Sequence, residues 1–274
     1  MAKRFRTIEV SNPAFQPENL TYVTVKSSNL KGRGDCTFFI PSQLSGVRKV
    51  VPAVILLHGV YGSHWAWTYN INVHNIAMKL IEERRIQPMV LVMPSDGLFG
   101  DGSGYFNHGD KDFEKWIVQD VVSMISEVLK VEAGKVKLFL AGLSMGGYGA
   151  IRLMAKYPKQ FSGASGLSGI TNLKDFLPFL ARQEQVYYSK KFKAEEVFTY
   201  LKKNKRKLPQ FRFDCGTDDP LIKSNRLLHS RLEKEGIPHL YEEYPGGHSN
   251  EYWNQNIDKT LIFFDRILKE SNKG

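Results

Sequence analysis

Short apolar segments alternate with longer stretches of helical periodicity along the chain. Segments 53–59 (AVILLHG) and 136–142 (VKLFLAG) are almost entirely apolar, as expected for strands that are covered on both faces of a sheet. In segment 112–131, apolar residues recur at spacings of three and four, which predicts an amphipathic helix. This alternation predicts an α/β fold in which helices cover both faces of a mostly parallel sheet.

Eight segments have the length and composition of strands: 21–27, 36–41, 53–59, 88–94, 135–142, 161–168, 210–216 and 239–245. We therefore expect an eight-stranded sheet, with the first two strands paired as a hairpin at its edge. The stretch from about 171 to 208 interrupts the alternation of strands and helices. The chain has no internal repeat or low-complexity linker, so we expect residues 1–274 to form one domain with a small cap-like insertion at 171–208.

Composition narrows the class of protein. The chain has 274 residues, of which 42% are hydrophobic, and it contains no run of eighteen apolar residues that predicts a membrane span. Basic residues near the start are not followed by an apolar segment, so we expect no secretory signal and a cytoplasmic location, although a processed secreted form would look the same. Cys36 and Cys215 lack metal-ligand spacing and fit a reducing compartment.

The formal net charge of +10 raises the question of an anionic partner. Eight basic residues fall within 190–207, interleaved with Glu195 and Glu196. We interpret this stretch as a solvated helix face, with an anion-attracting rim near a substrate entrance as the alternative. No motif of a DNA- or RNA-binding module is present, so we expect neither a nucleic-acid nor a membrane partner.

The segment Gly142-Leu143-Ser144-Met145-Gly146 has the pattern G-x-S-x-G. A predicted strand runs directly into Ser144 and a predicted helix follows it, which is the context of a nucleophile elbow. Residues two before and two after the serine must be small in such a turn, and both are glycine. The sequence thus predicts Ser144 as a nucleophile, against the alternative of a structural turn serine.

A serine hydroxyl needs a general base, and the base needs an orienting acid. In this architecture the acid and then the histidine follow the serine along the chain. His248 comes after Gly246 and Gly247 at the end of a predicted strand, and we predict it as the base. The loop after strand 210–216 supplies Asp218 and Asp219, and the residues alone leave the choice between these neighbours open.

Acyl transfer also needs donors for the oxyanion of the tetrahedral intermediate. The backbone N–H of Met145, directly after the serine, is one expected donor. The second is expected from the loop after strand 53–59, where Val60 is our choice and Tyr61 the alternative. His58 is expected to brace this loop by hydrogen bonds.

Four blocks, in this order, resemble the "Putative esterase" family of α/β hydrolases, also called esterase D-like or tributyrin-type carboxylesterases: 56–63 (LLHGVYGS), 142–161 (GLSMGGYGAIRLMAKYPKQF), 215–222 (CGTDDPLI) and 244–254 (YPGGHSNEYWN). The likeness runs from about residue 20 to 268 and implies the α/β-hydrolase fold. In the family, the acid stands three residues after the glycine of the CGTxD block. The resemblance therefore favours Asp219 as the acid.

The resemblance implies a serine carboxylesterase that hydrolyses short-chain or carbohydrate-linked (acetyl- or feruloyl-type) esters through an acyl-enzyme, with no metal or cofactor. The expected partner is a small ester, such as a sugar ester. S-formylglutathione hydrolases usually carry a Ser-Gly-Leu-Thr-Cys loop where this chain has residues 58–61, which disfavours a glutathione thioesterase. Three alternatives stay open at this point: an acyltransferase with the same triad, a thioesterase like the S-formylglutathione hydrolases, and a catalytically silent binding module on the same fold.

Three aromatic residues are candidates for substrate binding. Tyr61 and Trp65 flank the expected oxyanion loop, where they would form an aromatic wall, with core packing as the alternative. Tyr105 lies in the glycine-rich stretch 94–110. We expect this loop to face the substrate because it follows the carboxyl end of a predicted strand.

Overall fold

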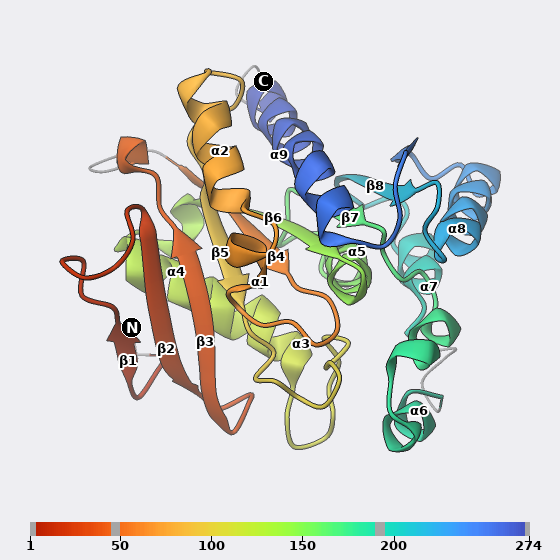
Figure 1. Cartoon of the computed structure of the whole chain (residues 1–274), viewed down its shortest axis with the longest axis horizontal. Coiled ribbons are helices and arrows are strands. Elements are labelled where there is room, and N and C mark those ends of the chain that lie inside the picture. Colours follow the sequence, from red (N-terminus) through yellow and green to blue (C-terminus); the bar gives the residue numbers. More distant parts are fainter. Residues whose placement is uncertain (1–3, 45–49, 190–194, 272–274) are drawn as a thin grey trace.

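The computed structural model describes residues 4–44, 50–189 and 195–271, and within them nine strands form one sheet. The sheet has the order β1-β2-β3-β5-β4-β6-β7-β8-β9 (Figure 1). The strands are β1 (Ile8–Val10), β2 (Leu20–Ser27), β3 (Gly32–Phe39), β4 (Val51–Leu57), β5 (Val90–Pro94), β6 (Val136–Leu143), β7 (Gly163–Leu167), β8 (Gln210–Gly216) and β9 (Leu240–Tyr244). From β5 to β9 all neighbours are parallel, which confirms the mostly parallel sheet.

The predicted strands are all present, but the expected total of eight was one too low. The additional strand, β1, has three residues and pairs antiparallel with β2. Such a short segment carries too few positions for alternation of apolar and polar residues to be recognised. The predicted hairpin exists, since β2 pairs antiparallel with β3 over its full length. It lies one strand inside the edge, because β1 covers it.

The central strands are covered on both faces. Along β4, Ala53, Ile55 and Leu57 belong to one apolar cluster, whereas Val54 and Leu56 belong to the other. Successive side chains of a strand point to opposite faces, so a continuous apolar run supplies two cores at once. This is the physical reason for the pattern seen in the sequence.

The part of the chain that the structure describes contains nine helices, most of which cover the two faces of the sheet, whereas α6 lies away from it (Figure 1). They are α1 (Ala66–Tyr69), α2 (Val73–Glu82), α3 (Phe113–Lys115), α4 (Val122–Leu129), α5 (Met145–Lys156), α6 (Arg182–Ser189), α7 (Val197–Lys203), α8 (Ile222–Lys234) and α9 (Asn250–Ser271). Helices α1, α2 and α9 pack on one face, and α4, α5, α7 and α8 on the other. A π-helical turn, Trp116–Val121, joins α3 to α4 within the predicted helix 112–131.

Residues between β7 and β8 form the 3₁₀ helix η4 (Leu173–Phe179), α6 and α7. This is the stretch predicted as a cap-like insertion. The single-domain organisation with that cap stays a prediction. Of the basic stretch 190–207, residues 190–194 lie outside the described residues. In the described part, Lys202 forms an ion pair with Glu235 at 2.6 Å.

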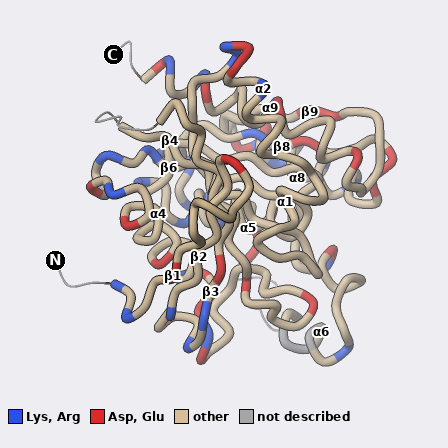
Figure 2. Tube along the Cα trace, turned by 60° about the vertical axis from the view of Figure 1, so that its left-hand side comes forward, with Lys and Arg blue, Asp and Glu red and all other residues tan. Residues whose placement is uncertain are grey.

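Basic and acidic residues are interspersed along most of the described chain (Figure 2). Among the described residues, no helix is both long enough and apolar enough to cross a membrane.

A buried ion cluster anchors helix α5, which begins directly after Ser144. The guanidinium of Arg152 donates to Glu114 Oε2 at 2.6 Å and to Glu195 Oε2 through its Nε at 2.7 Å. Glu114 also accepts from Lys156 and Tyr157. Burial alone would raise the pKa of Glu114, but the Arg152 charge and these hydrogen bonds outweigh burial and lower it. The cluster therefore holds α5 against α3 and against Glu195, which precedes α7.

We expect Glu114→Gln to lower the free energy of unfolding at pH 7 by about 3 kcal/mol, because it leaves the buried Arg152 charge undercompensated. A lowered pKa means that the stabilisation is present above the ordinary pKa of glutamate, about 4.3, and is lost as pH falls below it. Urea unfolding at several pH values should show the difference between wild type and variant shrinking in acid. The exposed Glu127→Gln, on α4, is the matched control. A constant difference down to pH 3 would contradict the account.

Candidate active site

Ser144 lies in a sharp turn between β6 and α5. Its backbone has φ 53° and ψ −119°, a combination that costs free energy in any residue with a side chain. The turn is held by its neighbours: the Ser144 N–H donates to Leu167 O at 3.0 Å, and Ser144 O accepts from the N–H groups of Tyr148 and Ile170. Surrounding hydrogen bonds thus maintain a conformation that the residue would not adopt alone.

Gly142 and Gly146 make this turn sterically possible. A Cβ on Gly142 would lie 2.2 Å from the carbonyl carbon of Gly146, and a Cβ on Gly146 would lie 2.0 Å from Leu57 O. Both contacts are with backbone atoms, which cannot rotate away. Close backbone contacts with β4 and within the turn are therefore the reason that the residues on either side of the serine must be small.

Ser144, His248 and Asp219 form a continuous chain of hydrogen bonds. His248 Nε2 lies 2.9 Å from Ser144 Oγ, and His248 Nδ1 lies 2.8 Å from Asp219 Oδ2. A carboxylate can only accept, so Nδ1 carries the proton and Nε2 accepts from the serine hydroxyl. The structure thus brings together the three residues that the sequence singled out.

The structure distinguishes the two neighbouring aspartates. The side chain of Asp219 is fully buried, and its second oxygen, Oδ1, accepts from the Leu221 N–H at 2.8 Å. Asp218 is exposed to solvent. Only Asp219 contacts His248 among the two, in agreement with the choice that the family resemblance favoured.

The loop that carries His248 lies against the end of β8. Gly246 has φ 125°, and its carbonyl oxygen would lie 2.2 Å from a Cβ on Gly216. After the loop, the Tyr252 hydroxyl donates to the buried Asp214 at 2.8 Å. Close approach on one side and this hydrogen bond on the other hold His248 near Asp219, which lies in the loop after β8.

Two aromatic rings enclose the His248 imidazole. Phe179 is stacked on it, with ring centroids 6.0 Å apart and an interplanar angle of 25°. Trp253 meets it edge-on, with centroids 5.0 Å apart. The His248 side chain is only 17% exposed as a result. Sequence patterns did not single out either ring. Phe179 is distant from His248 along the chain, and Trp253 lies in the first turn of α9, where nothing in the sequence indicates contact with the imidazole.

Two backbone N–H groups beside Ser144 are unused. Among the described residues, neither the N–H of Val60 nor that of Met145 donates to another protein group. The N–H of Tyr61, by contrast, donates to Asp101 O at 2.9 Å. Of the two candidates in the loop after β4, Val60 is therefore the one with an available donor.

His58 braces the loop after β4 by hydrogen bonds, as expected from the sequence. Its side chain is buried, with Nδ1 2.7 Å from Gly59 O and Nε2 accepting from the Asp96 N–H at 3.2 Å. The ring thereby joins the loop after β4 to the loop after β5.

A pocket of about 270 Å³ opens beside Ser144. Its lining is mostly apolar and consists of Gly59, Val60, Tyr61, Gly62, Ala66, Asn70, Ile71, Leu143, Ser144, Phe179, His248, Asn250 and Trp253. A larger hollow, of about 400 Å³, lies at the amino ends of β8 and β9 and contains none of the three hydrogen-bonded residues. We take the smaller pocket as the candidate site because Ser144 and His248 both line it.

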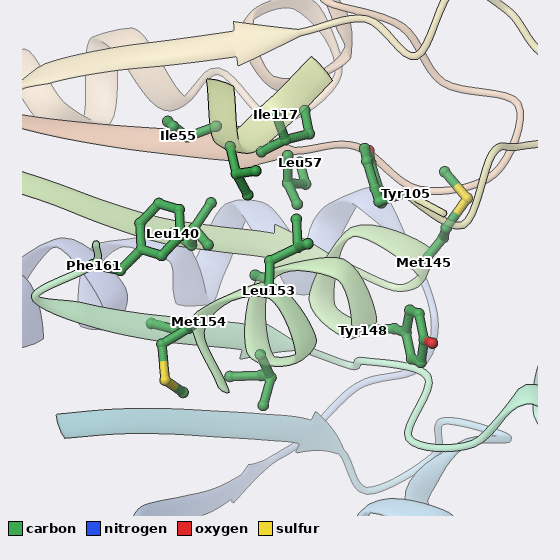
Figure 3. Packing of buried hydrophobic residues seen from close by; sticks show 14 of the residues in the cluster. Ile55, Leu57, Tyr105, Ile117, Leu140, Met145, Tyr148, Leu153, Met154 and Phe161 are labelled. Carbon is green, nitrogen blue, oxygen red and sulfur yellow. The ribbon is translucent and has the colours of Figure 1, made fainter. Parts of the chain in front are cut away.

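The three predicted substrate-binding residues have different placements. Tyr61 lines the pocket, whereas Trp65 is 43% exposed and is not part of the lining. Tyr105 is a correction: it is fully buried, its hydroxyl donates to His58 O at 2.9 Å, and its ring lies in the core near Met145 (Figure 3). Packing against Gly149, where a Cβ would lie 2.5 Å from the ring, explains why the ring points inward.

The sequence of this chain matches a known protein family. The family model described as "Putative esterase" matches residues 27–264. The chain belongs to this esterase family. The chain is also similar to an acetyl esterase of Caldicellulosiruptor saccharolyticus, with 27% identity over 97% of this chain and 95% of that protein.

Solved structures confirm the α/β-hydrolase fold of this esterase. A ferulic acid esterase superposes with a TM-score of 0.79 at 22% identity, covering 90% of this chain and 98% of the other. An S-formylglutathione hydrolase from Staphylococcus aureus superposes with a TM-score of 0.71 at 17% identity, covering 94% and 98%. The family match identifies the protein as an esterase.

We expect Gly146→Ala to lower the free energy of unfolding by about 3 kcal/mol or more, because its Cβ overlaps backbone atoms of β4. Gly134→Ala is the matched control, since a Cβ there meets nothing within 4 Å, and it should change the free energy by less than about 0.5 kcal/mol. Urea unfolding of both variants measures the difference. Equal stability of the two variants would show that the elbow accommodates a side chain.

Proposed function

We propose that this esterase hydrolyses short-chain or carbohydrate-linked carboxylic esters through a covalent acyl-enzyme on Ser144. The observation that carries the proposal is the hydrogen-bonded chain from Ser144 Oγ through His248 to the buried Asp219, beside a pocket with two unused N–H donors. A hydroxyl, an imidazole and a carboxylate in this order can activate a serine for nucleophilic attack.

The first step is attack on the ester carbonyl. Ser144 Oγ forms a bond to the carbonyl carbon while His248 Nε2 takes the hydroxyl proton. The imidazolium that forms is stabilised by Asp219, whose burial removes competing water. Collapse of the tetrahedral intermediate breaks the bond to the alcohol oxygen, which leaves with the proton from Nε2.

The oxyanion of that intermediate needs donors that are already in place. Val60 and Met145 supply them in our proposal, and each such donor contributes about 3–4 kcal/mol of transition-state stabilisation. The position of Met145 at the start of α5 adds the positive end of the helix dipole. Because neither N–H has a partner among the described residues, no existing bond must break when the charge develops.

The second step repeats the first with water. His248 removes a proton from water as it attacks the acyl carbon, and Ser144 leaves with that proton when the carboxylic acid is released. All residues required for the two steps belong to this chain. An acyltransferase would use the same steps with an alcohol in place of water.

Pocket size and lining favour a small acyl or alcohol group next to Ser144. The walls are apolar, with the side chains of Asn70 and Asn250 as the polar exceptions apart from the catalytic candidates. Acetyl and feruloyl esters, the substrates suggested by the names of two relatives, differ greatly in size. We take the acetyl group as the first choice, because the relative named for it matches nearly the whole chain and the pocket of about 270 Å³ accommodates it with the ring of Phe179 in place.

Ser144→Ala should abolish turnover of p-nitrophenyl acetate, butyrate and octanoate, with kcat falling by about 10⁴-fold or more. The rates of wild type on the three esters then measure the acyl preference. Product analysis with a sugar alcohol as acceptor distinguishes hydrolysis from acyl transfer. Equal activity of wild type and Ser144→Ala would exclude Ser144 as the nucleophile, and inactivity of both on aryl and sugar esters would favour a binding module.

The neighbouring aspartates offer a matched pair of variants. Asp219→Asn should lower kcat by about 10³–10⁴-fold, because an amide facing Nδ1 no longer favours the productive tautomer or stabilises the imidazolium. Asp218→Asn, one residue away and exposed, should change kcat by less than about threefold. Steady-state kinetics on p-nitrophenyl acetate measures both. The reverse order of effects would assign the acid to Asp218.

A further inference from the structure

Three loop segments meet over the pocket at Tyr61. The first is the oxyanion loop itself, residues 59–62. Its Tyr61 N–H donates to Asp101 O in the loop after β5 at 2.9 Å. The Tyr61 hydroxyl donates to Phe179 O in the insertion at 2.6 Å. One residue of the oxyanion loop thus contacts both of the other segments.

Asp101 connects the same segments from the other side. Its backbone oxygen accepts from Tyr61, and its side-chain Oδ2 accepts from the Ala181 N–H at 2.6 Å. A carboxylate that accepts from a backbone N–H makes a strong, charge-assisted hydrogen bond. We call these three hydrogen bonds, which join Tyr61, Asp101, Phe179 and Ala181, the Asp101 clasp.

The backbone at Tyr61 depends on such external support. Tyr61 has φ 59°, a left-handed conformation that is unfavourable for a residue with a bulky side chain. The preceding residue, Val60, carries the unused N–H beside Ser144. Contacts that keep Tyr61 in this conformation therefore also determine where the Val60 N–H points.

The clasp holds Phe179 as well. The carbonyl oxygen of Phe179 accepts a hydrogen bond from Tyr61, and its ring lies over His248. Ala181, two residues after Phe179, donates its N–H to Asp101. In this position the ring forms one wall of the pocket. A substrate group that takes up the space of the Phe179 ring would displace Phe179, whose carbonyl oxygen is held by Tyr61.

We infer that Asp101 is a positioning residue, whose clasp aligns the Val60 N–H for the oxyanion and holds Phe179 where it restricts the pocket to small ester groups. The inference rests on the proposed function and deepens it. It links the insertion between β7 and β8 to the chemistry of Ser144, so that transition-state stabilisation and substrate size are set by one set of contacts.

Asp101→Ala removes the acceptor for Ala181, whereas Asp101→Asn keeps an oxygen in that place. We expect Asp101→Ala to lower kcat on p-nitrophenyl acetate by about 10–100-fold with KM changed less than about threefold, as for loss of oxyanion alignment. Asp101→Asn should recover kcat to within about threefold of wild type. Asp110→Ala, an exposed aspartate of the same stretch, is the control and should stay within about twofold.

Rates are to be expressed per active site, titrated with a fluorophosphonate. If the role of Asp101 is purely structural, Asp101→Ala will reduce the number of titratable sites but leave kcat per site at the wild-type value. That value, with or without a loss of titratable sites, would overturn the inference. If Asp101→Ala behaves as wild type while Ser144→Ala is inactive, only this inference fails; activity in Ser144→Ala would refute the proposed function itself.

Phe179→Ala and Tyr61→Phe test the restriction of size. The ratio of kcat/KM for octanoate to that for acetate should rise about tenfold in Phe179→Ala, because the wall is removed. Tyr61→Phe keeps the ring but loses the hydroxyl bond to Phe179, so the ratio should rise less. Unchanged ratios in both variants would show that the clasp does not set the acyl preference.

Discussion

The site depends on close backbone packing at two glycines. Gly142 and Gly146 lie so near the turn and the end of β4 that neither position has room for a side chain. This packing allows β6 to turn directly into α5 with Ser144 at the apex, in a conformation that isolated peptides avoid. Buried hydrogen bonds that join the turn to Leu167 and Ile170, together with the ion cluster of Arg152, hold it there. The free-energy cost of the strained turn is thus offset by the rest of the α/β core.

Parallel strands bring the other groups to the same place. The loops after β4, β6, β8 and β9 all lie at the carboxyl edge of the sheet, where ligands bind in folds of this type. Each loop supplies one component: the Val60 N–H, the Ser144 hydroxyl, the Asp219 carboxylate and the His248 imidazole. The segment between β7 and β8 adds Phe179, and the Asp101 clasp joins that segment to the loop after β4.

Local sequence patterns were sufficient to predict the positions of residues whose placement depends on their own loop. Glycines around Ser144 and before His248 pointed to the turns that the structure contains, and the order of strands located Asp219 to within one residue. Tyr105 was misplaced because its direction is decided by Gly149 and His58, which are distant in sequence. Phe179 was missed for the same reason: nothing near it in the chain indicates a ring stacked on an imidazole.

The central claim, an acyl-enzyme on Ser144, is tested most directly by trapping it. The esterase is mixed with excess p-nitrophenyl acetate, quenched in acid within the first turnover, digested and analysed by mass spectrometry. The account predicts one acetyl group on the peptide that carries Ser144, with a burst of p-nitrophenol when release of the acyl group is the slower step. Turnover with no acetyl group on that peptide, or with the group on another residue, would contradict it.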